Sequence, residues 1–337
     1  LDQTVALEAF KAGKFDFNLE STAKTWATAY TGERFSSGQI VKEEIVHQMP
    51  VGMQAFAFNT RRAVFADRRV REALAYAFDF EWTNRQLFHN QYTRTRSFFQ
   101  NSDLASSDLP SGEELALLEP FRNKLPADVF TRPYTPPVTD GSGNLRSNLR
   151  TALQLLKEAG WEIKDGALTH TQSGQPLRFE ILLRQKEFER VVLPFVQNLE
   201  RLGVKASIRM VDSTQYVERV RAFDFDMMVH SIGQSESPGN EQRDFWHSAN
   251  ADVAGSRNVI GIKDPVVDAL IDKVIQAPDR QSLVHRTRAL DRVLLWGHYV
   301  IPQWHLSKQR IAYWAHLQRP TQVPRSGVDL DTWWVKP

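Results

Sequence analysis

Acidic and amide side chains occur in two arrangements that could do chemistry. Asp224 and Asp226 are two residues apart in a predicted strand, so their carboxylates share one face and could form an acid–base pair. The exposed edge of a strand explains the same spacing, and we favour that interpretation. The second arrangement is a polar loop over residues 233–240, whose candidate ligand-binding residues are Gln234, Ser235, Glu236, Ser237 and Asn240.

Familiar catalytic motifs are missing from the sequence. None of the patterns GxSxG, HExxH, GxGxxG and GxxxxGKS/T occurs. There is no cysteine, which excludes thiolate chemistry and cysteine-based metal sites. His298 and His305 are seven residues apart on a predicted strand, so they point to opposite faces and are interpreted as packed or hydrogen-bonded side chains. We therefore predict no catalytic residue, no metal site and no cofactor.

The polar loop follows a predicted buried strand. An apolar run precedes it, formed by Phe225, Met227, Met228, Val229 and Ile232. Gly233, Pro238 and Gly239 prevent the loop from continuing a strand or a helix. Folds of the α/β class place ligands where buried strands end in such loops, because the rigid sheet aims adaptable side chains into a crevice. A surface connection without a ligand is the alternative that stays open.

Strands and helices alternate around this strand. The predicted order is a helix from about 148 to 159, a strand at 177–183, a helix at 188–202, a strand at 204–211, a helix at 214–220 and the strand at 225–232. This order favours crossover connections and therefore a mixed or parallel sheet. Earlier in the chain, residues 40–59 predict a hairpin in which Phe56 and Phe58 lie opposite Ala55 and Ala57.

Length and composition restrict the class of protein. The 337 residues exceed one ordinary domain of roughly 100–200 residues, which favours two lobes. The net charge of +2 is too balanced to indicate nucleic acid or an anionic membrane as a partner. No run approaches the ~18 apolar residues of a transmembrane helix. The sequence opens at Leu1 with a short helix and a strand and without a signal peptide, so we expect that a preceding segment is missing.

An ordered set of segments resembles the peptide-binding class of bacterial extracellular solute-binding proteins of ABC importers. These segments are AFKAGKFDFN, FNTRRAVFADRRVREALAYAFDFEW, ALQLLKEAGW, LERLGVKASIRMVDSTQY and FDFDMMV. Further segments are similar to the YejA-like branch of this class: SESPGNEQRDFW, GSRNVIGI, ALDRVLLWGHYVIPQWH, RIAYW and DLDTWW. The set spans nearly the whole chain.

The resemblance implies a two-lobed α/β fold of the periplasmic-binding-protein type II, oligopeptide-binding class, with mixed sheets and the N-terminal part of lobe I missing. It implies that residues 1–90 are the later half of lobe I, residues 91–305 are lobe II and residues 306–337 return to lobe I. Such a receptor is periplasmic and captures peptides or peptide-like compounds, such as the antibiotic microcin C, for an inner-membrane ABC importer permease. It needs no cofactor, binds no nucleic acid and is expected to be a monomer.

The resemblance also suggests how a ligand is held. Members of this class anchor the ligand's α-ammonium with an aspartate in the loop that corresponds to residues 233–240. No aspartate stands there in this chain; either Glu236 takes that role one or two positions along, or this branch binds differently. Arg190 occupies a place where dipeptide-binding relatives clamp the ligand's carboxylate, although pairing with Glu187 or Glu189 would equally explain it.

Two other functions stay open. The same fold could bind a sugar, a metal chelate or haem, because fold alone does not determine the ligand. A hydrolase is a further alternative, which the missing nucleophile and metal motifs oppose. Under the leading interpretation, residues 225–229 form a buried strand and residues 234–240 line the cleft between the lobes.

Overall fold

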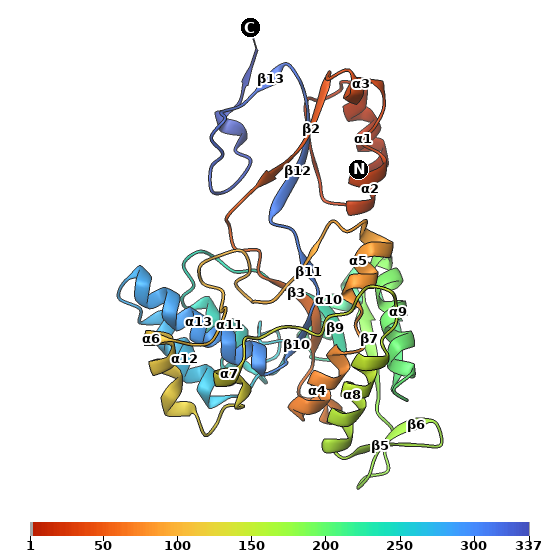
Figure 1. Cartoon of the computed structure of the whole chain (residues 1–337), viewed down its shortest axis with the longest axis vertical. Helices are drawn as coiled ribbons and strands as arrows, with labels where there is room; N and C mark the ends of the chain where they lie inside the picture. Colours follow the sequence, from red (N-terminus) through yellow and green to blue (C-terminus); the bar gives the residue numbers. More distant parts are fainter. Residues whose placement is uncertain (1–2, 337) are drawn as a thin grey trace.

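The computed structural model describes residues 3–336, which divide into two units with separate sheets (Figure 1). The small unit comprises residues 3–46 and 308–336, so both ends of the described chain lie in it. The large unit comprises residues 53–305. Within residues 3–336, no helix is both long enough and apolar enough to cross a membrane.

The small unit is built on a three-stranded antiparallel sheet with β12 in the centre, in the order β1–β12–β2. One face of β12 carries Ala312, which packs among Phe10, Trp26 and Tyr30; the other face carries Ile311 and Tyr313. This alternation follows from the two-residue period of a strand. The elements of the unit are α1 (Gln3–Lys11), β1 (Phe17–Glu20), α2 (Ala23–Thr28), α3 (Glu33–Ser36), β2 (Ile40–Val46), β12 (Lys308–Trp314), β13 (Leu317–Gln318), η5 (Leu330–Thr332) and β14 (Trp334–Val335).

The large unit has a five-stranded mixed sheet in the order β10–β3–β9–β7–β8. Strand β7 (Arg178–Leu183) runs parallel to both β8 (Lys205–Met210) and β9 (Met227–Ile232), whereas β3 (Met53–Phe58) is antiparallel to β9 and to β10 (Val300–Pro302). The predicted mixed sheet is therefore present, and the predicted strand at 225–229 is found as β9, preceded by the buried Phe225.

Helices cover both faces of this sheet. On one face lie α4 (Arg68–Ala75), α5 (Phe80–Phe88), α8 (Arg146–Glu158) and α9 (Glu189–Glu200), and on the other lie α6 (Gly112–Leu118), α7 (Asp128–Thr131), α11 (Glu241–Trp246), α12 (Pro265–Ile275) and α13 (Arg280–Trp296) (Figure 1). The remaining elements are η1 (Ala63–Phe65), β4 (Thr93–Arg94), η2 (Glu119–Phe121), β5 (Trp161–Lys164), β6 (Ala167–His170), η3 (Lys186–Phe188), α10 (Ser213–Arg221), η4 (Ser248–Asn250) and β11 (Trp304–His305).

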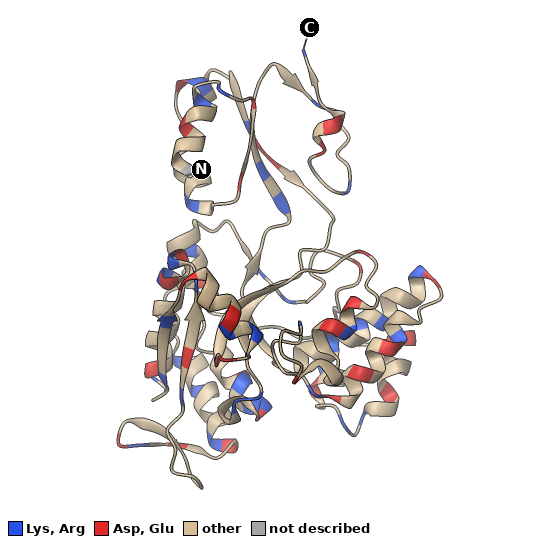
Figure 2. Cartoon of the chain, turned by 180° about the vertical axis from the view of Figure 1, so that it is seen from behind, with Lys and Arg blue, Asp and Glu red and all other residues tan. Residues whose placement is uncertain are grey.

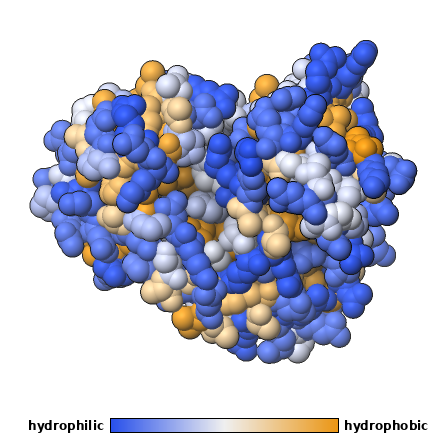
Figure 3. All heavy atoms as spheres, turned by 90° about the horizontal axis from the view of Figure 1, so that it is seen from below, coloured by the Kyte–Doolittle hydropathy of each residue, from blue (hydrophilic) through white to orange (hydrophobic). Residues whose placement is uncertain are grey.

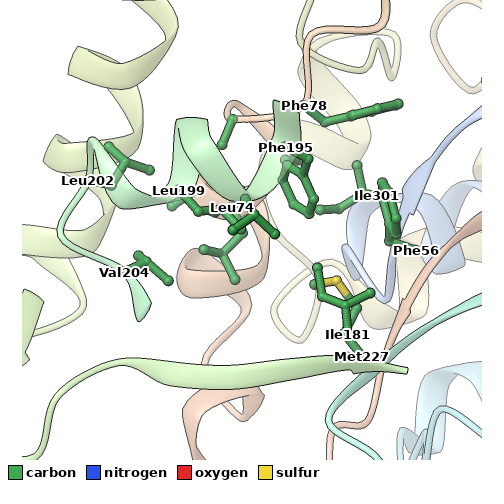
Figure 4. Close-up of a cluster of buried hydrophobic side chains, with 14 of the residues drawn as sticks. Phe56, Leu74, Phe78, Ile181, Phe195, Leu199, Leu202, Val204, Met227 and Ile301 are labelled. Atoms are coloured by element: carbon green, nitrogen blue, oxygen red, sulfur yellow. The ribbon is translucent and has the colours of Figure 1, made fainter. Parts of the chain in front are cut away.

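Aromatic rings fill the core under α9. Phe56 stacks on Phe195 at a centroid distance of 4.9 Å, and Phe78 meets Phe56 edge-on at 5.4 Å (Figure 4). Phe56 and Phe58 face this core while Ala55 and Ala57 face the opposite one, as the alternation in the sequence predicts. The core therefore holds β3 and α9 together although they are far apart in the sequence.

The chain passes between the units twice. Because β3 pairs with β9 and β10 and α4 packs with α8 in the large unit, the first passage lies at residues 47–52. The second passage lies between β11 and β12. The expected lobe boundaries near residues 90 and 305, and the correspondence of these units with lobes I and II of a complete receptor, stay predictions.

Charged and apolar residues are mixed over the surface. Along the ribbon of both units, basic and acidic residues are interspersed (Figure 2). Seen from below, apolar residues lie in separate groups between hydrophilic ones (Figure 3). This distribution fits the near-neutral net charge of +2.

Candidate ligand-binding cleft

The carboxyl ends of β7 and β9 border a cavity of about 410 Å³, here called the strand-end cavity. Leu183 at the end of β7 and Gln185 after it border the cavity, together with His230 and Ser231 of β9 and Tyr216 of α10. Parallel strands place their carboxyl ends at the same edge of a sheet, and this edge is where open α/β sheets receive ligands.

A second cavity, of about 220 Å³, lies between the two units and adjoins the first. Gln54 and Phe188 line both cavities. The small unit contributes Ser21, Thr22 and Ala23 to this inter-unit cavity, whereas α5, α9 and β11 contribute the opposite wall. We refer to the two adjoining cavities together as the cleft.

Aromatic side chains form much of the inter-unit wall. The ring of Trp304 lies 4.6 Å from that of Phe88 and 6.2 Å, nearly parallel, from that of Phe188, and Tyr92 meets Phe88 edge-on at 5.1 Å. Trp304 is held by the pairing of β11 with β4, and Phe188 ends η3 just before α9. Such rings offer large apolar contact area that does not depend on one ligand sequence.

Arg190 lies in the first turn of α9 and lines the inter-unit cavity. Its side chain is exposed, and its guanidinium lies 6.0 Å from the ring of Phe88. Among the described residues it forms no ion pair with Glu187 or Glu189, the alternative considered from the sequence. Pro194, four residues later, has no N–H to donate to the carbonyl of Arg190. The side chain of Arg190 is therefore available at this wall.

The loop 233–240 does not reach the cleft. Glu236 pairs instead with Arg325 of the small unit at 2.9 Å, and its carbonyl accepts a hydrogen bond from Arg280, which also pairs with Asp103. The Glu236 carboxylate therefore faces the other unit rather than the outer surface of the large unit. Half-exposed pairs of this kind contribute little to stability.

The other predicted loop residues are engaged within their own segment. Gln234 accepts a hydrogen bond from Gln242 at 2.7 Å, and the Ser235 hydroxyl accepts one from the Ser237 N–H at 3.3 Å. Asn240 precedes α11 and is exposed. In the described chain, none of the five loop residues lines either cavity of the cleft. Their role in ligand binding stays a prediction.

Neutral and cationic groups dominate the strand-end cavity. Burial, with the nearby Arg257 guanidinium, lowers the pKa of His230 to about 4, so its imidazole is neutral at pH 7. Burial also raises the pKa of Tyr216, over whose ring Arg184 lies at 5.3 Å. Arg184 has no carboxylate partner among the described residues. The cavity can therefore attract an anionic group at its rim while its interior stays uncharged.

Sequence reasoning missed several residues that line the cleft, including Gln54, Phe88, Phe188, His230 and Trp304. Gln54 was the one with a local signal, because it is the only polar side chain in the strand MQAFAF. It donates a hydrogen bond to Gln303 at 3.0 Å. The aromatic residues had no such signal, since their spacing also suits core packing.

Asp224 and Asp226, considered above as a possible acid–base pair, each form ion pairs with arginine side chains. Arg62 pairs with Asp224 at 3.3 Å and with Asp226 at 2.9 Å, and Arg219 pairs with Asp224 at 3.2 Å. Both acids precede β9, at the end of the strand opposite the cleft. The exposed-edge interpretation therefore describes them better than acid–base chemistry does.

The prediction that His298 and His305 share a strand is wrong. His305 lies in β11 and contacts the Thr95 hydroxyl at 3.2 Å, whereas His298 lies before β10 with a positive φ of 49°. Both are packed, with His298 8% exposed. Within residues 3–336, no group of three or more His, Asp or Glu side chains is placed to hold a metal ion.

Comparison with known proteins shows the family. The profile of the bacterial extracellular solute-binding proteins, family 5 (middle part), matches residues 1–252, and the chain belongs to this family. The probable peptide-binding protein YejA of Agrobacterium fabrum is 46% identical over 336 residues, which cover 99% of this chain and 55% of that protein. The chain spans about half the length of the curated relatives it matches.

Solved structures show the same fold at low sequence identity. The oligopeptide-binding protein AppA from Bacillus subtilis, in complex with a nonapeptide, matches with a TM-score of 0.71 at 19% identity, covering 100% of this chain and 59% of that one. NikA from Brucella suis, in complex with Fe(III)-EDTA, matches with a TM-score of 0.68 at 18% identity, covering 99% and 60%. The predicted class of fold and the predicted family are both confirmed.

Proposed function

We propose that this chain acts in an extracytoplasmic receptor that captures peptides or peptide-like compounds and delivers them to the permease of an ABC importer. The cleft carries this proposal, because it combines the carboxyl edge of a parallel sheet with an aromatic wall between two units. Membership of a solute-binding family and the peptide-binding name of the YejA relative support it. The receptor works in the periplasm as a monomer and without catalysis.

The ligand is held by contacts that tolerate different side chains. Trp304, Phe188 and Phe88 cover apolar parts of the ligand, and the polar groups of Gln54 and Gln185 bind its backbone amides. Arg190 binds the ligand's carboxylate at the mouth of the inter-unit cavity. The small unit forms one wall of the cleft, so a ligand can contact both units when they are closed. Such a ligand favours the closed arrangement by the difference between its binding free energies for the closed and the open arrangements.

Glu236 is proposed as the anchor of the ligand's ammonium, with Gln234, Ser235, Ser237 and Asn240 beside it. Glu236 pairs with Arg325 in the structure, so the ligand's ammonium must replace the Arg325 guanidinium before Glu236 can bind it.

An anionic metal chelate is a second candidate ligand. Arg184 and Arg190 have no carboxylate partners in the described part of the chain and stand at the rims of the two cavities, which suits a negatively charged compound. The NikA neighbour holds Fe(III)-EDTA. A chelate would bind mainly through the two arginines and would make fewer contacts with the aromatic wall.

Calorimetric titration separates the two candidates. Trialanine and Fe(III)-EDTA are titrated into the chain and into the variants Trp304→Ala and Arg184→Gln. A peptide receptor binds trialanine and loses most of that affinity in Trp304→Ala, whereas Arg184→Gln changes it little. Binding of Fe(III)-EDTA alone, lost in Arg184→Gln, would replace the peptide proposal with the chelate.

A further inference from the structure

The charged side chains of the strand-end cavity have one sign. Arg184, directly after β7, and Arg221, at the end of α10, line the cavity, and among the described residues that line it there is no Asp or Glu. Its uncharged polar side chains include Gln185 and Ser231. All four of these residues are exposed, so a ligand that enters from solvent can reach them.

The two arginines differ in how far their charge is already used. Arg221 pairs with Glu218, one turn earlier in α10, at 3.3 Å. Within residues 3–336, neither an ion pair nor a hydrogen bond engages the Arg184 guanidinium. A guanidinium carries five N–H donors in a planar fork and cannot lose its charge at neutral pH. Arg184 is therefore the lining residue with charge and donors to offer a ligand.

Tyr216 holds the Arg184 side chain at the wall of the cavity. The guanidinium lies 5.3 Å from the centre of the Tyr216 ring, and the Tyr216 hydroxyl donates to the Val229 carbonyl at 3.1 Å, which ties the ring to β9. A cation that lies over an aromatic ring is attracted by the ring's face, and this contact consumes none of its N–H donors. Arg184 is thus oriented without being neutralised.

The other titratable side chains of the cavity are neutral at pH 7. Burial, with the nearby Arg257 guanidinium, lowers the pKa of His230 to about 4, and burial raises the pKa of the Tyr216 hydroxyl. Neither group adds charge to the cavity at pH 7. The charge that a ligand meets there is therefore that of the arginines.

The inter-unit cavity differs in charge and is connected to the strand-end cavity. Glu187 lines it together with Arg190, so an acidic group there meets charges of both signs. Gln54 and Phe188 line both cavities, so a peptide whose terminal carboxylate lies at Arg190 can extend into the strand-end cavity. The strand-end cavity, of about 410 Å³, falls within the roughly 300–1,000 Å³ of ligand pockets and has room for a side chain.

We propose that Arg184 gives the receptor a preference for acidic peptides, by binding the side-chain carboxylate of a Glu or Asp of the ligand in the strand-end cavity. This inference rests on the proposed peptide-binding function. The carboxylate accepts hydrogen bonds from two N–H groups of the guanidinium, the geometry in which arginine binds carboxylates most specifically. The ligand's terminal carboxylate stays with Arg190, so the two kinds of carboxylate use different arginines.

Pairs of tripeptides that differ in one charge test the preference. Glu-Ala-Ala, Ala-Glu-Ala and Ala-Ala-Glu, each with a counterpart in which Gln replaces Glu, are titrated calorimetrically into the full 337-residue chain. Glu and Gln have nearly the same size, so packing does not separate the members of a pair. In at least one pair the Glu peptide is expected to bind about tenfold more tightly, a difference of about 1.4 kcal/mol. High salt should reduce this difference, because Arg184 is exposed.

Variants of Arg184 then assign the preference to this residue. Arg184→Gln should abolish the preference for Glu over Gln and change the affinity of the Gln peptides little, and Arg184→Glu should make the corresponding Lys peptide the tighter ligand. Arg150→Gln is the matched control, because Arg150 in α8 is exposed and lines neither cavity of the cleft. It changes the net charge of the chain as Arg184→Gln does and should keep the preference. Both positions are exposed, so the melting temperature should stay unchanged.

The possible outcomes separate this inference from the proposed function. Equal binding of the Glu and Gln members of every pair would refute the preference and leave peptide binding in place. A preference that persists in Arg184→Gln would belong to another residue and would refute the role of Arg184. Binding of none of the tripeptides would overturn the inference together with the proposed function.

Discussion

The large and small units differ in how their sheets are covered. The five-stranded sheet of the large unit has helices and buried side chains on both faces, whereas the small unit packs a three-stranded sheet with a few buried residues on each face. Strands β1 and β2 form the two edges of the small sheet. Since buried apolar area is the main source of stability, the large unit is the rigid body that positions the cleft.

Few contacts join the units. Two chain passages connect them, and side-chain contacts such as Glu236 with Arg325, Gln91 with the Ala23 carbonyl and Tyr92 with the Ser21 carbonyl bridge the gap. These three contacts are polar and partly exposed, so each contributes little. Ala23 of the small unit also packs in the apolar core of the large unit. We infer that the large unit sets the geometry of the cleft and that the small unit is its less firmly held wall, and five predictions test this inference.

The largest effect is expected in the core of the large unit. Phe56→Ala removes a fully buried ring that stacks on Phe195, and it should lower the free energy of unfolding by about 3–5 kcal/mol. Urea denaturation followed by circular dichroism measures this change. Leu193→Ala, at a position 44% exposed on α9, is the control and should stay within about 0.5 kcal/mol of the parent chain. Equal effects of the two variants would contradict the assigned core.

The matching change in the small unit should act locally. Phe10 is also fully buried, but its cluster is confined to the small unit. Phe10→Ala should speed amide hydrogen exchange in β1, β2 and β12 and leave β7 and β9 protected, because the units are joined by few contacts. Hydrogen exchange measured by mass spectrometry tests this. Faster exchange across both sheets would show that the units unfold as one.

Loss of the aromatic wall should cause the largest change in ligand binding. Trp304→Ala removes the ring that contacts Phe88 and Phe188, and we expect trialanine affinity to fall about tenfold to a hundredfold, or about 1.4–2.8 kcal/mol. Calorimetric titration gives the affinity, and the far-ultraviolet spectrum confirms that the variant is folded. A folded variant with unchanged affinity would place the ligand elsewhere.

Stability of the large unit should depend on pH through its buried histidines. Burial lowers the pKa of His230 from 6.5 to about 4, so between these values the unfolded chain binds the proton more readily than the folded one. Stability should therefore fall as the pH decreases from 6.5 toward 4, and His230→Gln should reduce this dependence. Urea midpoints measured across this range test it. His305, whose pKa is likewise lowered to about 4, offers an independent variant, and a pH dependence unchanged in both variants would rule out these histidines as its source.

The smallest effect is expected at the contact between the units. Glu236→Gln breaks the half-exposed ion pair with Arg325 and should change stability by less than about 1 kcal/mol. If Glu236 anchors the ligand's ammonium, the variant weakens binding of trialanine more than binding of its N-acetyl form. Arg325→Gln is the control, since it breaks the same pair but keeps the carboxylate. Equal losses for both peptides in Glu236→Gln would remove Glu236 from the anchor role.

Local patterns in the sequence were sufficient for much of the large unit. The spacing of Phe56 and Phe58 against Ala55 and Ala57 shows which face of β3 is which, and the order of helices and strands predicts the mixed sheet. The same patterns placed a polar loop after β9, where it is found. They failed for the predicted hairpin over residues 40–59, because β2 pairs with β12 and β3 pairs with β9 and β10, and strand alternation does not specify the partner strand.

Residue types at short spacing along the chain predicted the helices and strands, and the ordered set of segments resembled the family that the comparison confirms. The residues of the cleft could not be predicted in this way, because they come together only through the packing of distant segments. Gln54, Phe188 and Trp304 are separated by more than a hundred residues at each step and meet because β3, η3 and β11 lie together at the cleft. The pairing of Glu236 with Arg325 arises in the same way, since contacts between distant residues leave no local pattern to read.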